Sequence, residues 1–354
     1  MAIDTPRVSV ITTIRNGERF LAEAIASILG QSYGDFEYLL VDDASTDTSP
    51  EIIAHFAGQD PRIVALHNAK SINHSNAINV ALAVARGELV AILDADDLAH
   101  PQRLERQVLF LDANPEVGVV GAQVQKIDSD GRPQNTMSFP TTATLSRWSI
   151  LFGTPVLHSA AMMRRALLQA IGGYSVQWRY ANDYSLWAEL IDRTTISNLT
   201  ETLVSYRHHE EQTSSTRATP QRGEVWLLIH RMLAERLALR IPLNDIGVLY
   251  HGTRGVSLGD GTALEQAAAL LAAIRARYFV VEQPDAATAD QINADCAWRL
   301  LTMAWVHRHS HRTESRIVFH NALVLDPQLF LRNKTCARLR LLFRSDRRQA
   351  KAPA

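Results

Sequence analysis

The sequence predicts an α/β protein in which a doubly wound sheet, covered by helices on both faces, is followed by a mostly α-helical C-terminal region. Three observations support this prediction. Short β-branched runs alternate with helical patterns over residues 1–110, polar clusters follow three of these runs, and segments rich in Ala, Leu and Arg dominate beyond residue 220. Strand–helix–strand repetition of this kind favours a mostly parallel sheet with right-handed crossovers.

The strands are predicted from continuous apolar runs, which suit strands that are covered on both faces. The run VSVIT is the first, and FEYLLV, which ends at Asp42 and Asp43, is the second. The run LVAIL leads directly into the acidic segment DADD. The predicted strands are Val8–Thr12, Phe36–Val41, Ile63–His67, Leu89–Leu93, Val117–Val124 and Thr200–Arg207.

The helices are predicted from apolar residues at helical spacing and from capping residues. Apolar residues between Phe20 and Ile28 recur at this spacing, and Thr48 or Ser49 can cap the next helix, with Pro50 in its first turn. The stretch DSDGRPQNT is predicted to be a loop. Further helices are predicted over Asn76–Arg86, Pro101–Leu111, Ser146–Phe152 and Asp183–Ile191.

The C-terminal part is predicted to be helical over Glu224–Leu239, Thr262–Tyr278, Ala287–His307 and Glu314–Leu325. The change of composition predicts three parts of the chain: a first domain over 1–218, a helical domain over 219–335 and a basic tail over 336–354. The run HRHSH from His307 is interpreted as a solvated helix end rather than a metal-binding tract. In the tail, Leu339 and Phe343 stand among arginines. An amphipathic helix that contacts an anionic membrane over 336–351 and a disordered basic tail both fit this composition.

Composition excludes several classes of protein. Lys+Arg 36 against Asp+Glu 37 leave a net charge of −1, which disfavours a surface built for nucleic acid. Two cysteines cannot form a disulfide framework, and a reducing cytosol suits them. The chain lacks a run of about 18 apolar residues, and its N-terminus does not resemble a signal peptide. We therefore expect a cytoplasmic protein.

Two acidic clusters are candidates for chemistry. Asp94, Asp96 and Asp97 follow a buried strand, and Asp42 and Asp43 follow another. The carboxyl ends of parallel strands share one edge of a sheet, where ligands bind. Adjacent carboxylates repel one another unless a hard cation, itself holding substrate phosphates, lies between them. The alternative is that each cluster merely caps the following helix.

The spacing of these motifs resembles a known family. VSVITTIRNGERFLAEAIASILGQSYGDFEYLLVDDASTDTS, then NAINVALAVARGELVAILDADDLAHPQRLERQ, then GGY, NDYSLW and YRHHEEQTS, is similar to the family 2 glycosyltransferases of the GT-A fold. The resemblance extends over residues 7–215. It implies a Rossmann-like catalytic domain with a mixed sheet, which transfers a sugar from a nucleotide-sugar donor with inversion, assisted by Mn²⁺ or Mg²⁺.

The resemblance also implies roles for individual residues. It implies nucleotide-sugar binding by Thr13, Asp43, Asn79, Asp94 and Ala95, metal ligation by Asp96 and His209, and a catalytic base at Asp183. An inverting transfer needs such a base on the acceptor hydroxyl, opposite a leaving diphosphate whose charge is neutralised. Asp183 has a second interpretation as the first-turn carboxylate of its own helix.

The sequence departs from the family pattern at two places. Arg15 stands in a segment that usually reads I-P-x-Y-N, and Asn182 replaces the usual acidic residue before the base. The loss of a neighbouring carboxylate removes a repulsion that would raise the pKa of Asp183. Trp178 and Trp187 have two interpretations, an acceptor platform or core residues.

The resemblance implies an inverting enzyme, of the hexosyltransferase type, that uses a nucleotide-sugar donor, preferably a UDP-sugar. The implied acceptor is a hydroxyl of a glycan or lipid-linked molecule, as in bacterial surface polysaccharide synthesis, with peripheral attachment at the inner membrane face and homo-oligomerisation as options. Nucleic acid is not an expected partner. Two alternatives stay open: a nucleotidyltransferase on a similar scaffold, and an inactive glycan-binding or partner-binding protein.

Overall fold

The computed structural model describes residues 5–210, 212 and 218–331. The chain forms two compact units that divide after Val225. The predicted boundary at residue 218 falls at the first residue of helix α9 (Ala218–Leu237), which begins in the first unit and ends in the second. The catalytic role expected of the first part remains a prediction. The basic tail, 336–354, lies outside the described residues.

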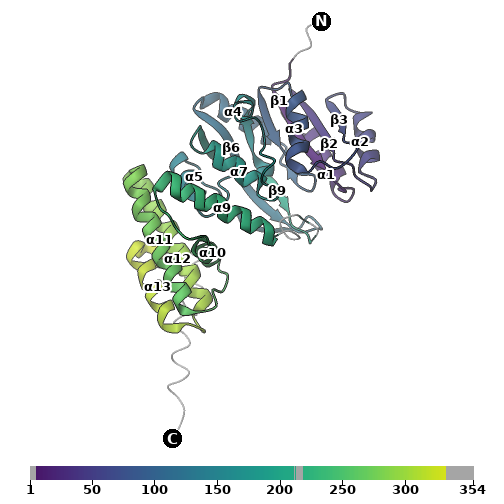
Figure 1. Ribbon diagram of the computed structural model, residues 1–354. Helices are drawn as coiled ribbons and strands as arrows, with labels where there is room; N and C mark the ends of the chain where they lie inside the picture. Colours follow the sequence, from purple (N-terminus) through teal and green to yellow (C-terminus); the bar gives the residue numbers. More distant parts are fainter. Residues whose placement is uncertain (1–4, 211, 213–217, 332–354) are drawn as a thin grey trace. The chain divides into compact units, whose positions relative to one another are not determined.

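The first unit is built on one mixed sheet with the order β3-β2-β1-β4-β8-β6-β9-β5, and β7 pairs with β6 (Figure 1). The expected α/β architecture is therefore confirmed. The strands are β1 (Val8–Ile14), β2 (Phe36–Asp42), β3 (Ile63–His67), β4 (Leu89–Ile92), β5 (Leu98–Ala99), β6 (Val117–Ile127), β7 (Pro133–Met137), β8 (Met162–Arg164) and β9 (Thr195–Arg207).

The four strands β3, β2, β1 and β4 are parallel neighbours. Every residue of β2 and β4 is buried, as expected for apolar strands covered on both faces. The register pairs Asp42 of β2 with Ile14 of β1 and with His67 of β3. The carboxyl ends of these strands therefore lie at one edge of the sheet, where the predicted polar clusters meet.

The other half of the sheet contains antiparallel strands, and this makes the sheet mixed. β8 lies antiparallel between β4 and β6, and β5 lies antiparallel to β9. The loop predicted for DSDGRPQNT is wrong for its last four residues, which belong to β7 and pair with β6. A tight turn allows this pairing, because Gly131 has a φ of 79° and its N–H donates to the Asp128 carbonyl.

The helices of the first unit agree with the predicted periodicity. The buried residues of α1 are Leu21, Ala24, Ile25 and Ile28. Thr48 takes the N-cap position of α2, but its hydroxyl donates to Glu18 instead of capping the helix. The helices are α1 (Leu21–Leu29), α2 (Ser49–Ala57), α3 (His74–Val84), α4 (Arg103–Ala113), α5 (Ala143–Ser149), α6 (Arg165–Ala170) and α7 (Asn182–Leu190).

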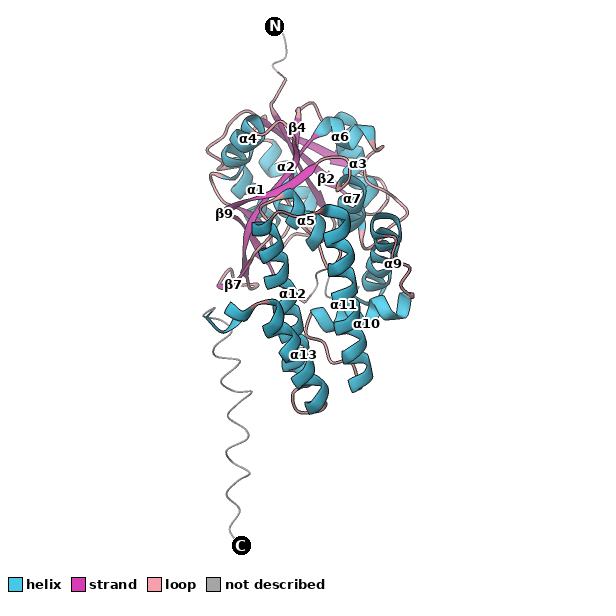
Figure 2. Ribbon diagram, turned by 90° about the vertical axis from the view of Figure 1, so that its left-hand side faces the viewer, coloured by secondary structure: helices cyan, strands magenta, loops and turns pink. Residues whose placement is uncertain are grey.

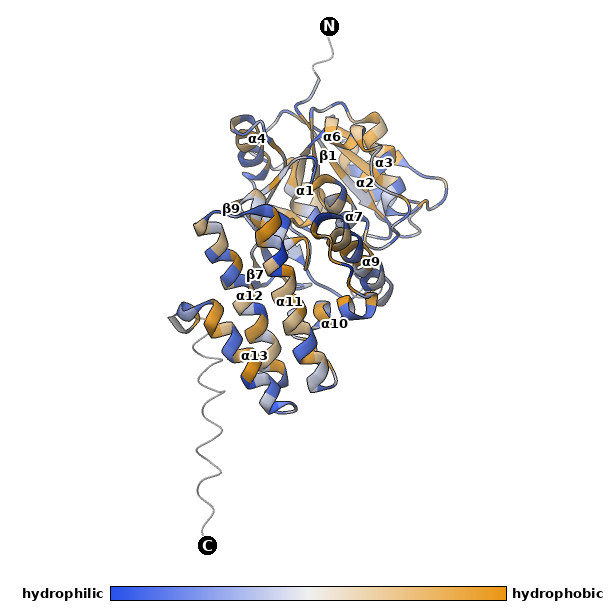
Figure 3. Ribbon diagram, turned by 60° about the vertical axis from the view of Figure 1, so that its left-hand side comes forward, coloured by the Kyte–Doolittle hydropathy of each residue, from blue (hydrophilic) through white to orange (hydrophobic). Residues whose placement is uncertain are grey.

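The second unit is helical, as predicted. In Figure 2, α11 and α12 run as long neighbouring helices with α13 beside them, and these three pack together. Apolar and polar residues alternate along them (Figure 3). Asp260 and Asp285 cap two of the helices by accepting backbone N–H groups. The helices of this unit after α9 are α10 (Leu243–Thr253), α11 (Gly261–Glu282), α12 (Ala286–His307) and α13 (Arg312–Leu325).

Two details of this unit differ from the prediction. Helix α10 was not predicted, because its glycines weaken the helical pattern, and tertiary packing favours one of them: a Cβ on Gly247 would lie 2.9 Å from the ring of Trp226. His307 is not solvated but fully buried. Its Nε2 accepts the Leu258 N–H (2.9 Å), so its Nδ1–H can donate to the Met303 carbonyl (2.8 Å). Within the described ranges, every helix is too short or too polar to span a bilayer.

Candidate active site

Asp43 lies buried at the end of β2 and forms hydrogen bonds with the loop before α3. Its carboxylate accepts hydrogen bonds from Asn68 Nδ2 (2.9 Å), Ser71 Oγ (2.7 Å) and the Ile72 N–H (2.9 Å). Burial alone would raise the pKa of Asp43, but these bonds and the Arg15 guanidinium outweigh it and hold the pKa below its usual value. Arg15 also donates to the Asp43 carbonyl oxygen, which accounts for one departure from the family pattern.

The loops at this edge of the sheet contain strained backbone. Asn16 after β1, Ala44 after β2 and Asn73 before α3 have φ angles of 53°, 58° and 73°. Left-handed conformations are unfavourable for side chains with a Cβ, and they persist only where surrounding contacts fix them. One such contact is the hydrogen bond from the Thr46 N–H to Asn16 Oδ1 (2.8 Å), which joins the loops after β1 and β2.

The acidic turn after β4 presents two carboxylates to histidines from other elements. Asp94 Oδ1 lies 3.4 Å from His158 Nδ1, and Asp96 Oδ2 lies 2.9 Å from His209 Nε2. Ala95 between them is partly buried and packs against the hydrophobic core. The structure thus brings together Asp96 and His209, the two residues proposed as metal ligands from the sequence.

The pKa values of the three carboxyl groups in the acidic turn shift in different directions. Burial raises the pKa of Asp96, and repulsion from Asp94 raises it further. Burial and the charge of Asp96 raise the pKa of Asp97 well above its usual value. Burial opposes ionisation of Asp94 as well, but the hydrogen bond and positive charge of His158 lower its pKa. Asp94 therefore keeps its charge more readily than its two neighbours.

Two buried arginines brace this turn. Arg103 of α4 is fully buried and donates to the carbonyl oxygens of Ile92 (2.8 Å) and Ala161 (3.2 Å). Burial lowers its pKa to about 10, so it remains a cation at neutral pH. Arg207 lies at the end of β9. Its side-chain Nε donates to the Asp96 carbonyl oxygen (3.0 Å), and its backbone N–H donates to Asp97 Oδ1 (2.8 Å).

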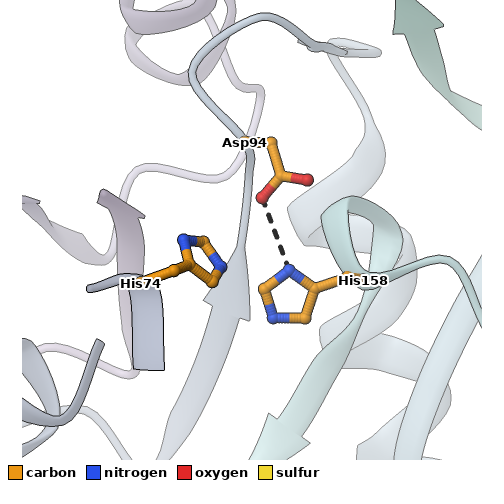
Figure 4. A group of neighbouring side chains, drawn as sticks. All are labelled: His74, Asp94 and His158. Atoms are coloured by element: carbon orange, nitrogen blue, oxygen red, sulfur yellow. Dashed lines mark hydrogen bonds and ion pairs between the residues drawn. The ribbon is translucent and has the colours of Figure 1, made fainter. Parts of the chain in front are cut away.

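Thr13 at the end of β1 reaches the same site through a histidine. Its Oγ1 lies 2.8 Å from Nδ1 of His74, the first residue of α3. Burial and repulsion from His158 lower the pKa of His74 to about 4, so His74 is neutral at pH 7. The His74 and His158 rings lie 5.6 Å apart between their centroids, and Figure 4 shows both beside Asp94.

Asn79 holds the loop that contains the GGY motif. Its Nδ2 donates to the Tyr174 carbonyl (2.9 Å), and its Oδ1 accepts the Tyr174 N–H (2.8 Å). Gly173 is required here, because its φ is 85° and a Cβ would lie 2.5 Å from Asn79 Oδ1. The Tyr174 hydroxyl lies 3.0 Å from His158 Nε2. The amide of Asn79 is thus engaged with protein backbone, and it supports the site through Tyr174.

Asp183 lies in the first turn of α7, with Oδ1 accepting the Tyr184 N–H (2.7 Å). Burial raises its pKa, and the positive charge of His158 partly opposes this rise. Asn182, in place of a second acid, accepts the Asp183 N–H (2.9 Å). A carboxylate with a raised pKa is a better proton acceptor than an ordinary one. Trp187 on the same helix is fully buried, as a core residue.

A carboxylate from α9 fixes the backbone just before Asp183. Glu224 accepts the N–H groups of Arg179 (3.2 Å), Tyr180 (2.8 Å) and Ala181 (2.8 Å). Ala181 is the N-cap residue of α7, so Glu224 satisfies backbone donors at the helix start and places a negative charge near its dipole. This contact sets the direction in which α7 begins.

The site residues that sequence reasoning missed are His74, His158, Glu224, Arg103 and Arg207. His74, His158 and Glu224 lie outside the motifs that carry the family resemblance, so no sequence signal pointed to them. Arg103 and Arg207 lie inside two of these motifs without an implied role, and Arg103 is also a charged residue on the buried face of α4. The roles predicted for Thr13, Asp43, Asn79, Asp94, Ala95, Asp96, Asp183 and His209 remain predictions.

Comparison with known sequences places this site in a family context. A family model described as glycosyl transferase family 2 matches residues 9–172. EpsE of Bacillus subtilis (strain 168), which its name assigns to the glycosyltransferases, is 34% identical over 248 residues, which are 68% of this chain and 85% of EpsE. The O-antigen biosynthesis glycosyltransferase WbnJ of Escherichia coli is 25% identical over 250 residues, 69% of this chain and 94% of WbnJ.

Solved structures share the fold. TarS 1–349 of S. aureus, in complex with UDP-GlcNAc, gives a TM-score of 0.55 at 19% identity and covers 91% of both chains. The mannosyltransferase PcManGT of Pyrobaculum calidifontis, in complex with GDP-Man and Mn²⁺, gives 0.54 at 22% identity, over 91% of this chain and 87% of its own. At these identities the likeness shows the fold, which confirms the expected GT-A architecture.

The hydrogen bonds to Asp43 make a prediction about stability. Asp43→Ala should lower the free energy of unfolding by about 2–4 kcal/mol at pH 7, because three hydrogen-bond donors lose a buried, charged acceptor. The folded-state pKa of Asp43 is lowered, so its contribution is present above the unfolded pKa and disappears as pH falls through the folded value. Urea unfolding between pH 7 and about pH 3 should show the difference narrowing in acid.

The control is Asp35→Ala, which removes an exposed carboxylate and should change stability little at any pH. A difference between Asp43→Ala and the unmodified chain that stayed constant across the pH range would contradict the assignment of the effect to the carboxylate charge.

Proposed function

The chain belongs to glycosyltransferase family 2, and we propose that it transfers a sugar from a nucleoside-diphosphate donor to a hydroxyl acceptor with inversion at the anomeric carbon. The observation that carries this proposal is the placement of Asp183, a buried carboxylate with a raised pKa, in electrostatic contact with Asp94 of the acidic turn and His158. A proton acceptor and a phosphate-facing acidic turn at one edge of the sheet are the two parts that an inverting displacement needs.

The acidic turn suits a divalent cation. Asp96 Oδ2 and His209 Nε2 lie 2.9 Å apart, and a carboxylate with an imidazole is a suitable ligand pair for Mn²⁺. The repulsion from Asp94 that raises the pKa of Asp96 is one that a bound cation relieves. Asp96 and His209 would hold the ion, and donor phosphate oxygens would complete its coordination. When bound, the ion supplies neutralisation of the charge on the leaving diphosphate.

The chain's own residues account for the rest of the reaction. Asp43 and Thr13 face the donor from the ends of β2 and β1, and Asp94 meets its ribose. Asp183 takes the proton of the acceptor hydroxyl as that oxygen forms a bond to the anomeric carbon. The bond from the anomeric carbon to the diphosphate oxygen breaks on the opposite face, so the configuration inverts. His158, whose pKa is raised through its bond to Asp94 against the effect of burial, interacts electrostatically with both carboxylates.

We extend the proposal to substrate class. Solved structures of the same fold contain UDP-GlcNAc or GDP-Man, and WbnJ takes its name from O-antigen biosynthesis. These similarities support a nucleoside-diphosphate-sugar donor and a role in surface polysaccharide synthesis. Within that class we propose a UDP-sugar donor and a glycan or lipid-linked acceptor. A screen of nucleotide-sugars for hydrolysis and transfer, with Mn²⁺ or Mg²⁺ present, tests the donor directly.

Asp96→Ala should abolish transfer, because the proposed cation loses a hard oxygen ligand. Binding of a nucleoside diphosphate, measured by isothermal titration calorimetry, should lose its enhancement by Mn²⁺ while the weaker metal-free binding stays unchanged. An excess of chelator should reproduce the effect in the unmodified enzyme. Near-normal transfer by Asp96→Ala, or in chelator, would rule out the assignment of this residue.

Asp183→Asn should lower the rate of transfer by about 10²–10⁴-fold, because the amide keeps the size of the side chain but cannot take the proton. Donor affinity should change little. The unmodified enzyme should gain activity as pH rises through the raised pKa of Asp183, since only the ionised form accepts a proton. The variant should lack this acidic limb. Loss of nucleotide affinity in Asp183→Asn would instead assign the residue to the donor site.

Glu224→Ala should lower kcat by about 10–10²-fold with little effect on donor affinity, because the base is misplaced when the start of α7 shifts. Glu224→Gln should retain more activity, since its carbonyl oxygen can still accept two of the N–H groups. The matched control is Glu235→Gln, an exposed residue on the same helix, which should resemble the unmodified enzyme. Equal losses in kcat and donor affinity would argue for general misfolding rather than positioning.

A further inference from the structure

Three potential metal ligands from separate parts of the chain converge beside the acidic turn. His74 begins α3, Asp94 follows β4, and His158 begins a short 3-10 helix (His158–Ala160). One ligand atom from each lies within 4.8 Å of the other two, and among the described residues this is the one cluster of at least three such groups. Figure 4 shows the two imidazole rings and the carboxylate facing a common space.

Each imidazole is oriented by a hydroxyl on its far side. His74 Nδ1 lies 2.8 Å from Thr13 Oγ1, and His158 Nε2 lies 3.0 Å from the Tyr174 hydroxyl. A hydroxyl can accept from an imidazole N–H, which leaves the lone pair of the opposite nitrogen directed into the cluster. Metal-binding histidines usually have such a partner on the nitrogen that does not ligate, because it fixes the tautomer and the ring orientation.

The supports of these ligands are themselves held by the fold. Asn79 clamps the backbone of Tyr174 with two hydrogen bonds, and Ser159 Oγ accepts the Asp94 N–H (3.0 Å). His158 is buried, so its ring has little freedom to turn away. A binding constellation is effective when its ligands are fixed by packing and by surrounding hydrogen bonds. The cluster meets this condition before any ion is present.

We propose that His74, Asp94 and His158 bind a transition-metal ion such as Zn²⁺ or Co²⁺, at a site separate from Asp96 and His209. Two imidazoles and one carboxylate suit these ions, whereas Mg²⁺ prefers oxygen ligands. Ligands at about 2.1 Å from an ion can be at most about 4.2 Å apart. The ligand atoms lie within 4.8 Å of one another, so any pair wider than about 4.2 Å must close slightly, which small side-chain rotations can provide.

The site has a consequence for the enzyme that rests on the proposed function. The ion would occupy Asp94 and the histidine joined to Thr13, both of which we place at the donor. An ion at this site and the nucleotide-sugar should therefore exclude each other. A Zn²⁺ or Co²⁺ ion would then act as a donor-competitive inhibitor, in contrast to the activating ion at Asp96.

The test uses the full chain without nucleotide and Co²⁺ as the probe, followed by its visible absorption. We expect one tightly bound equivalent with ligand-field bands, displaced by Zn²⁺ but not by Mg²⁺. His74→Ala and His158→Gln should each weaken Co²⁺ binding by about 10-fold or more. Asp96→Asn should retain the bands, and so should His55→Ala, which removes an exposed histidine. Thermal unfolding of each variant identifies any that fails to fold, and Thr13→Val offers a milder change that should still weaken binding.

Several results would overturn the proposal. Absence of a tight Co²⁺ equivalent, retention of the bands in both histidine variants, or their loss in Asp96→Asn would each exclude this site, the last by locating the ion at Asp96 and His209. The Co²⁺ readout needs no donor, so it stands or fails independently of transfer. Addition of UDP tests the competition separately: unchanged bands at saturating UDP would contradict the shared use of Asp94.

Discussion

The buried guanidinium of Arg103 is the interaction on which the rest of the site depends. Asp94, Asp96 and Asp97 follow one strand within a single turn, and their mutual repulsion opposes folding unless positive charge lies nearby. Arg103 lies fully buried beside them, and its charge adds to the larger effect of His158 in lowering the pKa of Asp94. Its hydrogen bonds to Ile92 at the end of β4 and to Ala161 before β8 also join the parallel half of the sheet to the antiparallel half.

β9 completes this arrangement from the other side. The strand runs parallel to β6 for most of its length and delivers Arg207 and then His209 to the acidic turn. Arg207 binds the backbone carbonyl of Asp96 and the carboxylate of Asp97, whereas the Asp96 carboxylate interacts with His209 and Gln212. The three acids therefore differ because each has a different partner: the buried His158 for Asp94, the partly buried His209 for Asp96, and the backbone N–H of Arg207 for Asp97.

The proposed base is organised by a different constraint. Asp183 would be an ordinary first-turn residue if the start of α7 were free to move. Glu224 removes that freedom by accepting three successive backbone N–H groups before the helix. Glu224 lies on α9, so the first part of this helix belongs to the unit that holds Asp183. The rest of α9 belongs to the helical second unit. The boundary between the units after Val225 follows directly on this contact.

The sequence by itself determined the parallel strands, the edge at which they end, and the family to which the chain belongs, because apolar runs and spaced motifs are local signals. It did not determine β7 or α10, whose formation depends on pairing with β6 and on packing of Gly247 against Trp226. It also misplaced His307, which is buried through a contact with Leu258. Only the tertiary structure decided that His74 and His158 lie beside Asp94, that Arg103 is buried next to the acidic turn, and that Glu224 fixes the backbone before Asp183. No local pattern encodes these contacts, because they depend on how separate elements pack together.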